Sequence, residues 1–258
     1  MRGVTMQILK LGGSVITRKG GYMEENQRAI AELTEMLARA WHGKVRDILL
    51  IHGAGSFGHA PVLRHGIRSK VKTPEEKKGM ADTHASVSEL SLILTSNLIA
   101  KGVPAVTLPP AALGRQSGGR ISEFNRKLVL EYLKAGYMPV LHGDMLLDKK
   151  NGATVCSGDQ MVSYFAKDAK RIIIGTDVDG VFAGTKLLPR ITRKGLNEVL
   201  PHLSMSAAPD VTGGMKGKIE ELLRTNKKCY VANALHPERI ELLLKGKPTI
   251  CTVVEKGK

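Results

Sequence analysis

The chain has 258 residues, of which 42% are hydrophobic, so it is long enough to bury the core of a large domain, and disorder is not expected. Its 39 Lys and Arg residues exceed its 24 Asp and Glu residues by 15, and such a surplus attracts nucleic acids, acidic membranes or phosphate groups. Aromatic residues make up only 4% of the chain and do not alternate with the basic clusters, so a base-stacking surface for nucleic acid is not expected.

Cysteine usage and the N-terminus indicate the compartment. Cys156, Cys229 and Cys251 are far apart and form no CxxC pair, which argues against a zinc site or a disulfide framework and fits a reducing environment. The chain reaches an apolar strand and a glycine turn too early for a secretory signal peptide. No apolar run approaches the roughly 18 residues that a membrane span requires. We therefore expect a cytoplasmic protein without a membrane partner.

Short runs rich in Val, Ile and Leu alternate with longer segments of helical periodicity. Strands are expected at Gln7–Leu11, Asp47–His52, Ala105–Leu108, Met138–Leu141, Arg171–Gly175, Cys229–Ala232 and Thr249–Val254. Helices are expected at Asn26–Ala40, Pro74–Ala100, Arg126–Ala135, Gly158–Lys167, Lys216–Asn226 and Pro237–Leu244. The stretch DKKNGAT, residues 148–154, predicts a hairpin turn. Because strands and helices alternate, the order predicts an α/β fold, a three-layer αβα sandwich with a mostly parallel central sheet.

The domain organisation is expected to be simple. No repeat, low-complexity tract or Ser- and Pro-rich linker divides the chain, so residues 1–258 are predicted to form a single domain. Within it we expect two lobes that meet near residue 165, an N-lobe of about residues 1–165 and a C-lobe of about residues 166–258.

The first predicted strand leads into a glycine turn, KLGGS, residues 10–14. Glycine allows backbone N–H groups to turn toward a phosphate without a Cβ in the way. Lys10 ends the apolar strand, and an inward lysine at that position requires an anionic partner, while Lys19 follows the turn. These residues predict a phosphate-binding loop.

A second glycine loop, HGAGSFGH at residues 52–59, follows the second predicted strand. Its GxGxxG spacing is that of the dinucleotide fingerprint, which requires a helix directly after the glycines and an acidic residue at the end of the next strand. Here Pro61 follows the glycines, so no helix is expected directly after them. The next acidic residues, Glu75 and Glu76, fall at the start of a helix and not at the end of a strand. We therefore interpret this loop as a second anion-binding loop.

Two phosphate-binding loops at neighbouring strand ends suit a donor and an acceptor phosphate held in line, because phosphoryl transfer depends chiefly on positioning and charge neutralisation. The GxxxxGK[ST] motif is absent, which excludes a P-loop kinase. An acceptor phosphate is already anionic, so it needs no carboxylate base and benefits from a donor such as a protonated His59.

Four motifs resemble the amino acid kinase family in their order along the chain. They are ILKLGGSVIT near the start, HGAGSFGH, GTDVDGVF at residues 175–182 and DVTGGMKGKI at residues 210–219. Within that family, the His59 ending of the glycine loop, with HGD at residues 142–144 and SGDQ at residues 157–160, is similar to the isopentenyl phosphate kinases. The resemblance covers essentially the whole chain.

The resemblance implies the amino acid kinase fold, a homodimer, and phosphorylation of isopentenyl phosphate by ATP for isoprenoid precursor synthesis. It implies that the N-lobe binds the acceptor and forms the dimer and that the C-lobe binds the nucleotide. Mg²⁺ is expected as a cofactor, held mostly by the nucleotide phosphates and not by protein ligands.

The resemblance also implies roles for individual residues. Lys10 would contact the ATP phosphates and the transferred group, Lys19 would stabilise the transition state, and His59 would hydrogen-bond the acceptor phosphate. The implied acceptor-binding residues are Ala54, His59 and Gly158. The implied ATP-binding residues are Lys10, Gly12, Gly13, Ser14, Gly55, Asp177, Asp179, Gly180, Gly214 and Lys218. Asp144 would orient the lysines.

Two positions depart from the family pattern. The second glycine loop more often reads HGGG, and Ala54 at its third position would be strained by about 1 kcal/mol if φ had to be positive there. Lys216 is an extra cation near Lys218, and either lysine could meet ATP.

Two alternative functions stay open. A family member with another acceptor, such as fosfomycin or a nucleoside monophosphate, would share these motifs, and the polarity of its acceptor pocket would distinguish it. A non-catalytic regulator that binds nucleic acid on the same scaffold would use the basic surplus, although intact Lys10, Lys19 and His59 argue against it.

Overall fold

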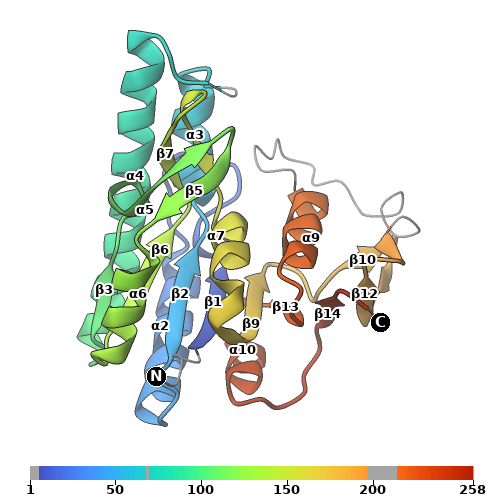
Figure 1. The fold of residues 1–258 in the computed structure, drawn as a ribbon. Coiled ribbons are helices and arrows are strands. Elements are labelled where there is room, and N and C mark those ends of the chain that lie inside the picture. The colour runs from blue at the N-terminus through green and yellow to red at the C-terminus, as the bar shows by residue number, and fades with distance from the viewer. Residues whose placement is uncertain (1–5, 68–69, 197–213, 258) are drawn as a thin grey trace.

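The computed structural model describes residues 6–67, 70–196 and 214–257, and its centre is an eight-stranded sheet (Figure 1). The strand order is β12-β14-β13-β9-β1-β2-β6-β3. The strands are β1 Met6–Leu11, β2 Ile48–His52, β3 Ala105–Thr107, β6 Met138–His142, β9 Ala169–Thr176, β12 Arg190–Thr192, β13 Cys229–Asn233 and β14 Thr252–Glu255. Neighbouring strands pair in parallel except β13 with β14. The predicted mostly parallel sheet is confirmed.

Helices cover both faces of this sheet. Leu9 and Leu11 of β1 face a core that they share with α2 (Gln27–His42), α4 (Pro74–Ala100) and α10 (Pro237–Leu244). Ile8 faces the opposite core, which includes side chains of α6 (Arg126–Lys134), α7 (Gly158–Phe165) and α9 (Gly214–Arg224). Because successive side chains of a strand point to opposite faces, an apolar run such as β1 fills both cores. The three-layer αβα arrangement is thus confirmed.

The long helix α4 has the predicted bounds, and its N-terminus shows why it begins there. The Thr73 hydroxyl accepts a hydrogen bond from the Glu76 backbone N–H at 3.2 Å, and the Glu76 carboxylate accepts one from the Thr73 N–H at 2.9 Å. Pro74 occupies the first turn, where its missing N–H costs nothing. Within the described ranges of the chain, neither α4 nor any other helix combines the length and the apolar character needed to cross a bilayer.

Two smaller sheets flank the main one. A four-stranded sheet has the order β5-β4-β7-β8, with β4 Gly114–Ser117, β5 Arg120–Phe124, β7 Asp144–Asp148 and β8 Gly152–Cys156. A two-stranded sheet pairs β10 (Phe182–Ala183) with β11 (Lys186–Leu187). The hairpin predicted at residues 148–154 joins β7 to β8. The chain also forms short helices at α1 (Gly13–Ile16) and α5 (Pro110–Leu113) and a 3₁₀ turn at Ala166–Asp168.

The prediction that no helix follows the second glycine loop was wrong, because α3 runs from Gly55 to Arg64 and includes Pro61. Proline has no backbone N–H, so inside a helix the carbonyl four residues before it receives no hydrogen bond. In α3 this is the carbonyl of Phe57. The Ser86 hydroxyl of α4 donates a hydrogen bond to this carbonyl at 2.5 Å. Because the neighbouring helix satisfies the acceptor, α3 continues through the proline.

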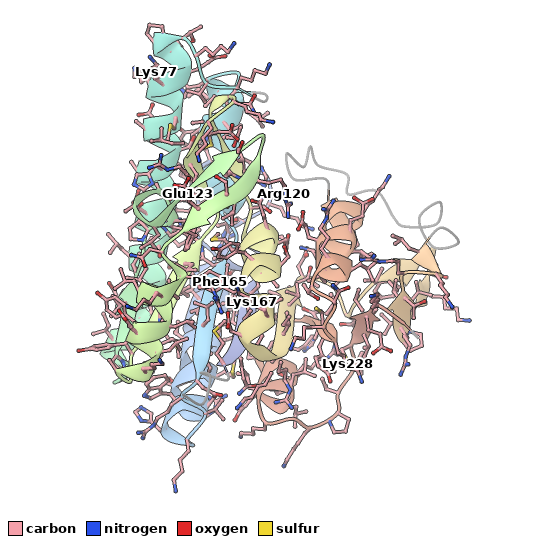
Figure 2. All side chains as sticks on the ribbon, in the orientation of Figure 1. Lys77, Arg120, Glu123, Phe165, Lys167 and Lys228 are labelled. Carbon is pink, nitrogen blue, oxygen red and sulfur yellow. The ribbon has the colours of Figure 1, made fainter. Side chains whose placement is uncertain are left out.

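Phe165→Ala is expected to lower the free energy of unfolding by about 3–5 kcal/mol, because it opens a cavity in the core beneath α7. The Phe165 ring is fully buried and makes edge contacts with Phe124 and Tyr164, with ring centroids 5.7 and 5.4 Å apart (Figure 2). Urea unfolding measures the change. Leu147→Ala is the control, since Leu147 is 62% exposed and its truncation should change stability by less than about 0.5 kcal/mol. Equal losses in both variants would contradict this packing.

Candidate active site

The two glycine loops touch each other where β1 and β2 end. A Cβ added at Gly13 would lie 2.3 Å from the backbone nitrogen of Gly55, and one added at Gly53 would lie 2.6 Å from that of Gly13. Gly55 also has a φ of +52°, which side-chain-bearing residues rarely adopt. The contact between the two backbones therefore requires glycine at these positions. This contact brings backbone amide groups of both loops together at the carboxyl ends of β1 and β2, where they can bind anions.

Ala54, the departure from the family pattern, is unstrained. Its φ of −76° and ψ of −28° are right-handed helical values, and it is the residue that precedes α3. The left-handed conformation falls on Gly55 instead. An alanine at position 54 is therefore compatible with the loop.

A buried carboxylate joins two lysines beside the loops. Lys10 is only 4% exposed, and its Nζ lies 3.1 Å from Oδ1 of Asp159 in the first turn of α7. Lys218 of α9 approaches the other oxygen of the same carboxylate at 3.6 Å. A Cβ at Gly158 would lie 3.4 Å from Lys10 Cε and 3.4 Å from the His52 carbonyl oxygen, so Gly158 packs directly on this cluster. The anionic partner that the sequence requires for Lys10 is Asp159.

The charges of this cluster depend on one another. Burial lowers the pKa of Lys10 to about 8, an effect that Asp159 opposes and Lys218 increases. Burial acts to raise the pKa of Asp159, but Lys10 and Lys218 outweigh it and lower that pKa to about 2. Asp159 is therefore ionised at neutral pH, and two lysines on one carboxylate leave a net positive charge that attracts a phosphate.

A second ion pair connects the first glycine loop to the end of β9. Lys19 Nζ lies 2.6 Å from Oδ2 of Asp177, and the Ser14 hydroxyl donates a hydrogen bond to Oδ1 of the same residue at 2.9 Å. Burial acts to raise the pKa of Asp177, but the hydrogen bonds from Lys19 and Ser14 lower it overall. Gly12 joins the same region, because its N–H donates to the Gly175 carbonyl at 2.8 Å.

Other predicted nucleotide-binding residues have neighbours outside these clusters. Asp179 accepts hydrogen bonds from Asn233 at 3.0 Å and Arg239 at 2.5 Å. Gly180 packs closely on Thr252, whose Oγ1 would lie 2.4 Å from an added Cβ.

Helix α9 carries the remaining predicted nucleotide-binding residues. Gly214 begins this helix with a φ of +60°. Residues 210–213, the first part of the fourth motif, lie outside the described residues. Of the two candidate lysines, Lys216 is exposed and Lys218 is the one that reaches Asp159.

Asp144, which was predicted to orient the lysines, has other hydrogen-bond partners among the described residues. Its carboxylate hydrogen-bonds His84 Nδ1 at 2.9 Å and accepts from the backbone N–H groups of Ala111 at 3.0 Å and Met145 at 2.8 Å. The carboxylate that contacts Lys10 and Lys218 is that of Asp159, which the sequence analysis missed. The available signal was its place in SGDQ, next to Gly158 and at a helix start, together with a buried lysine that needs a counter-charge.

The histidines near the loops differ in accessibility. His59 lies on α3 and is partly exposed, and its imidazole has no hydrogen bond or ion pair with any residue that the structure describes. His52 is fully buried against His142, with ring centroids 5.5 Å apart, as expected for a packing residue. Burial lowers the pKa of both buried rings, that of His52 to about 3, so they are neutral. His59 is thus the histidine that a ligand can reach.

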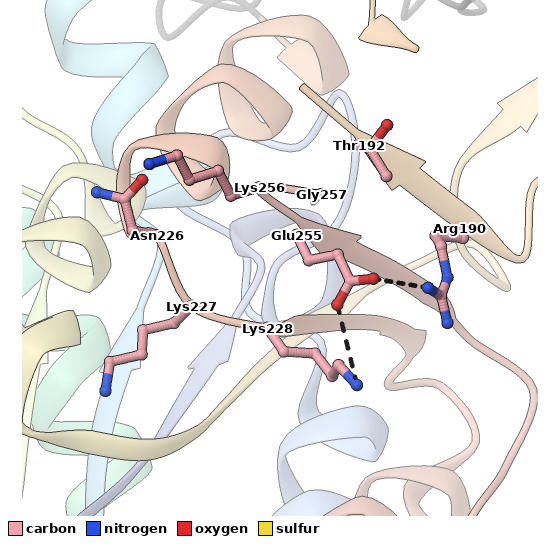
Figure 3. A pocket seen from close by; sticks show the side chains of 8 residues that line it. All are labelled: Arg190, Thr192, Asn226, Lys227, Lys228, Glu255, Lys256 and Gly257. Carbon is pink, nitrogen blue, oxygen red and sulfur yellow. Dashed lines mark ion pairs between the residues drawn. The ribbon is translucent and has the colours of Figure 1, made fainter. Parts of the chain in front are cut away.

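A surface hollow of about 640 Å³ lies elsewhere, at the end of the sheet formed by β12 and β14 (Figure 3). Its lining residues are Arg190, Thr192, Asn226, Lys227, Lys228, Glu255, Lys256 and Gly257. Glu255 pairs with Arg190 at 2.8 Å and Lys228 at 3.9 Å. None of the predicted site residues lines this hollow. Among the described residues, no group of three or more His, Cys, Asp or Glu side chains could hold a metal ion.

Asp159→Asn is expected to lower the pKa of Lys10 further below about 8, because Asp159 opposes the effect of burial on that lysine. An NMR titration of ¹³C-labelled lysine side chains measures it. Asp177→Asn is the control, since Asp177 pairs with Lys19 and should leave the Lys10 pKa unchanged. An unchanged Lys10 pKa in Asp159→Asn would show that the ion pair with Asp159 does not stabilise the protonated form of Lys10.

The lowered pKa of Lys10 makes the free energy of unfolding depend on pH. Between about pH 8 and the ordinary lysine pKa of 10.5, the unfolded chain binds a proton at Lys10 that the folded chain has released, so the contribution of Lys10 to stability rises with pH in that window.

Comparisons with known proteins agree with this geometry. Residues 5–233 match the amino acid kinase family. The chain is 37% identical to isopentenyl phosphate kinase of Methanothermobacter thermautotrophicus over 93% of its own length and 96% of that protein. It is 32% identical to isopentenyl phosphate kinase of Methanocaldococcus jannaschii, with coverage of 93% and 95%. Its fold is similar to an X-ray structure of isopentenyl phosphate kinase, with a TM-score of 0.82, 32% identity and coverage of 96% and 99%. The chain therefore belongs to the amino acid kinase family.

Proposed function

We propose that this protein transfers the γ-phosphoryl group of ATP to isopentenyl phosphate, which yields isopentenyl diphosphate and ADP. The observation that carries this proposal is the contact between the two glycine loops beside the Lys10–Asp159–Lys218 cluster. Two loops that meet in this way can hold two phosphates next to each other, and the lysines can neutralise their charge. The proteins to which the chain is 37% and 32% identical are named isopentenyl phosphate kinases.

In this reaction the donor phosphates would lie on the first glycine loop and at α9. Lys10 and Lys218 would neutralise the charge of the transferred group, and Asp159 would keep both ammonium groups in place. Lys19, which Asp177 holds beside the loop, would approach the same phosphates. Mg²⁺ would be bound chiefly by the nucleotide and would offset further phosphate charge. The nucleotide would thus use mainly the C-lobe, residues 166–258, with the first loop.

The acceptor phosphate would lie on the second glycine loop, against Ala54, Gly158 and the accessible His59. Its attacking oxygen already carries negative charge, so direct in-line transfer requires no general base. His59 would donate a hydrogen bond to this phosphate and hold it against repulsion by the ATP phosphates. This assigns acceptor binding to the N-lobe.

The surroundings of α3 favour a hydrocarbon tail on the acceptor. A small apolar cluster, separate from the two main cores, lies where α3, α4, β7 and β8 meet, and Val62 in it is one turn from His59. Its other members are Ile67, Val71, Met145 and Ala153, with Met80 and Val155 partly buried against them. These buried side chains would supply hydrocarbon contacts to an acceptor tail that enters between them, whereas a nucleoside monophosphate would need polar groups that read its base. An isoprenoid phosphate fits this chemistry better than a nucleotide acceptor or fosfomycin.

His59→Ala is expected to raise the KM for isopentenyl phosphate about 10- to 100-fold and to leave the KM for ATP unchanged, because it removes one hydrogen bond to a charged group. ADP release gives the acceptor KM when isopentenyl phosphate is varied at saturating ATP and Mg²⁺, and the ATP KM when ATP is varied at saturating acceptor. His42→Ala is the control, since His42 lies at the far end of α2 and bonds the Lys101 carbonyl.

Wild-type turnover is compared with isopentenyl phosphate, dimethylallyl phosphate, UMP and fosfomycin as acceptors. Turnover of UMP or fosfomycin alone would exclude the isoprenoid acceptor but keep the two-loop mechanism. An unchanged acceptor KM in His59→Ala would remove the histidine from the acceptor site.

We also propose that the protein forms a homodimer through the outer face of α4. Leu92 and Ile99 are 58% and 57% exposed and lie seven residues apart, on the same side of the helix. Leu92→Asp combined with Ile99→Asp is expected to convert a dimer into a monomer, measured by sedimentation velocity. Leu147→Asp is the control, since Leu147 is similarly exposed but lies on β7 and not on α4, and it should leave the dimer intact. A dimer that survives the double substitution would place the interface elsewhere.

A further inference from the structure

The β4–β5 hairpin forms a direct ionic contact with α9. Arg120 at the start of β5 forms a two-pronged ion pair with the Glu221 carboxylate, in which Nη1 meets Oε1 and Nη2 lies 3.2 Å from Oε2. Figure 2 shows Arg120 projecting from the hairpin toward α9. A bidentate pair of this kind fixes direction as well as distance, because both N–H groups must align with both oxygens.

The hairpin that carries Arg120 is itself firmly held. The Asp148 carboxylate accepts hydrogen bonds from the Gly118 and Gly119 N–H groups at 3.0 and 2.6 Å. The Gln160 side chain donates to the Gly119 carbonyl at 2.9 Å and accepts from the Ile121 N–H at 2.8 Å. Gln160 directly follows Asp159 in the first turn of α7. The turn at Arg120 is therefore fixed to the helix that carries the central carboxylate of the active site.

Glu221 lies three residues after Lys218 in α9, and residues three apart are neighbours on one side of a helix. The Ser163 hydroxyl of α7 also donates to Glu221 Oε2 at 3.1 Å, and Arg224 approaches Oε1 at 3.8 Å. Glu221 is thus the point at which the hairpin and α7 both hold α9. One turn earlier, the same helix presents Lys218 to Asp159.

We infer that Arg120 is a positioning residue for the kinase reaction. Through Glu221 it holds α9 in the placement that keeps Lys218 at Asp159 and at the donor phosphates. The inference rests on the proposed function for the identity of the reaction. Arg120 is about half exposed, and exposed ion pairs contribute little to global stability, so its effect should be visible in ATP binding and turnover.

Arg120→Gln is expected to lower kcat/KM for ATP about tenfold and to weaken ATP binding, measured by calorimetry, by a similar factor. The KM for isopentenyl phosphate should change less than twofold. Arg120→Lys should restore only part of the loss, because an ammonium cannot form the two-pronged pair. Arg115→Gln is the matched control, since Arg115 lies on the same hairpin but pairs with Glu123 of that hairpin.

A double-mutant cycle separates positioning from a general structural effect. In a Lys218→Ala background, Arg120→Gln should cause no further loss of ATP binding, because the lysine that it positions is gone. A loss in Arg120→Gln no larger than in Arg115→Gln, or an undiminished loss in the Lys218→Ala background, would overturn the inference. Glu221→Gln provides a second variant of the same pair if Arg120→Gln does not fold. ATP binding is measured without acceptor, so the test holds even if isopentenyl phosphate is not the acceptor.

Discussion

The candidate active site depends on one carboxylate that pairs with a buried lysine and with a partly buried one. Asp159 brings together Lys10 from the end of β1 and Lys218 from α9, two residues more than 200 positions apart in the chain. A buried ammonium without a counter-charge would lose its proton, whereas a carboxylate shared by two of them leaves one net positive charge. That charge lies beside the glycine loops, where a phosphate would arrive. The sheet, α7 and α9 therefore all serve to keep this cluster in place.

The same structural constraint explains why both loops are rich in glycine. They end neighbouring parallel strands, and the backbones of Gly13 and Gly55 approach so closely that neither position tolerates a side chain. A dinucleotide site would use one such loop to hold a pyrophosphate, whereas two loops in contact can hold two separate phosphates. The partly exposed His59 at the end of the second loop agrees with the phosphate acceptor that we propose there.

The apolar strands of the main sheet and the helix α4 could be predicted from the sequence, because buried parallel strands read as continuous apolar runs and Thr73 and Glu76 mark a helix start. Helix α3 could not, because only the tertiary contact from Ser86 satisfies the carbonyl that Pro61 leaves free. The carboxylate that contacts the lysines could not be identified from the sequence for the same reason. Asp144 and Asp159 both follow glycines in suggestive motifs, and only the folded chain shows which one meets the lysines.

The central claim, transfer of a phosphoryl group from ATP to isopentenyl phosphate, is tested most directly by ³¹P NMR of the reaction mixture. The account predicts that ATP, Mg²⁺ and isopentenyl phosphate give ADP and isopentenyl diphosphate in equal amounts, without orthophosphate. ADP accompanied only by orthophosphate, or no change in the ATP resonances, would contradict it.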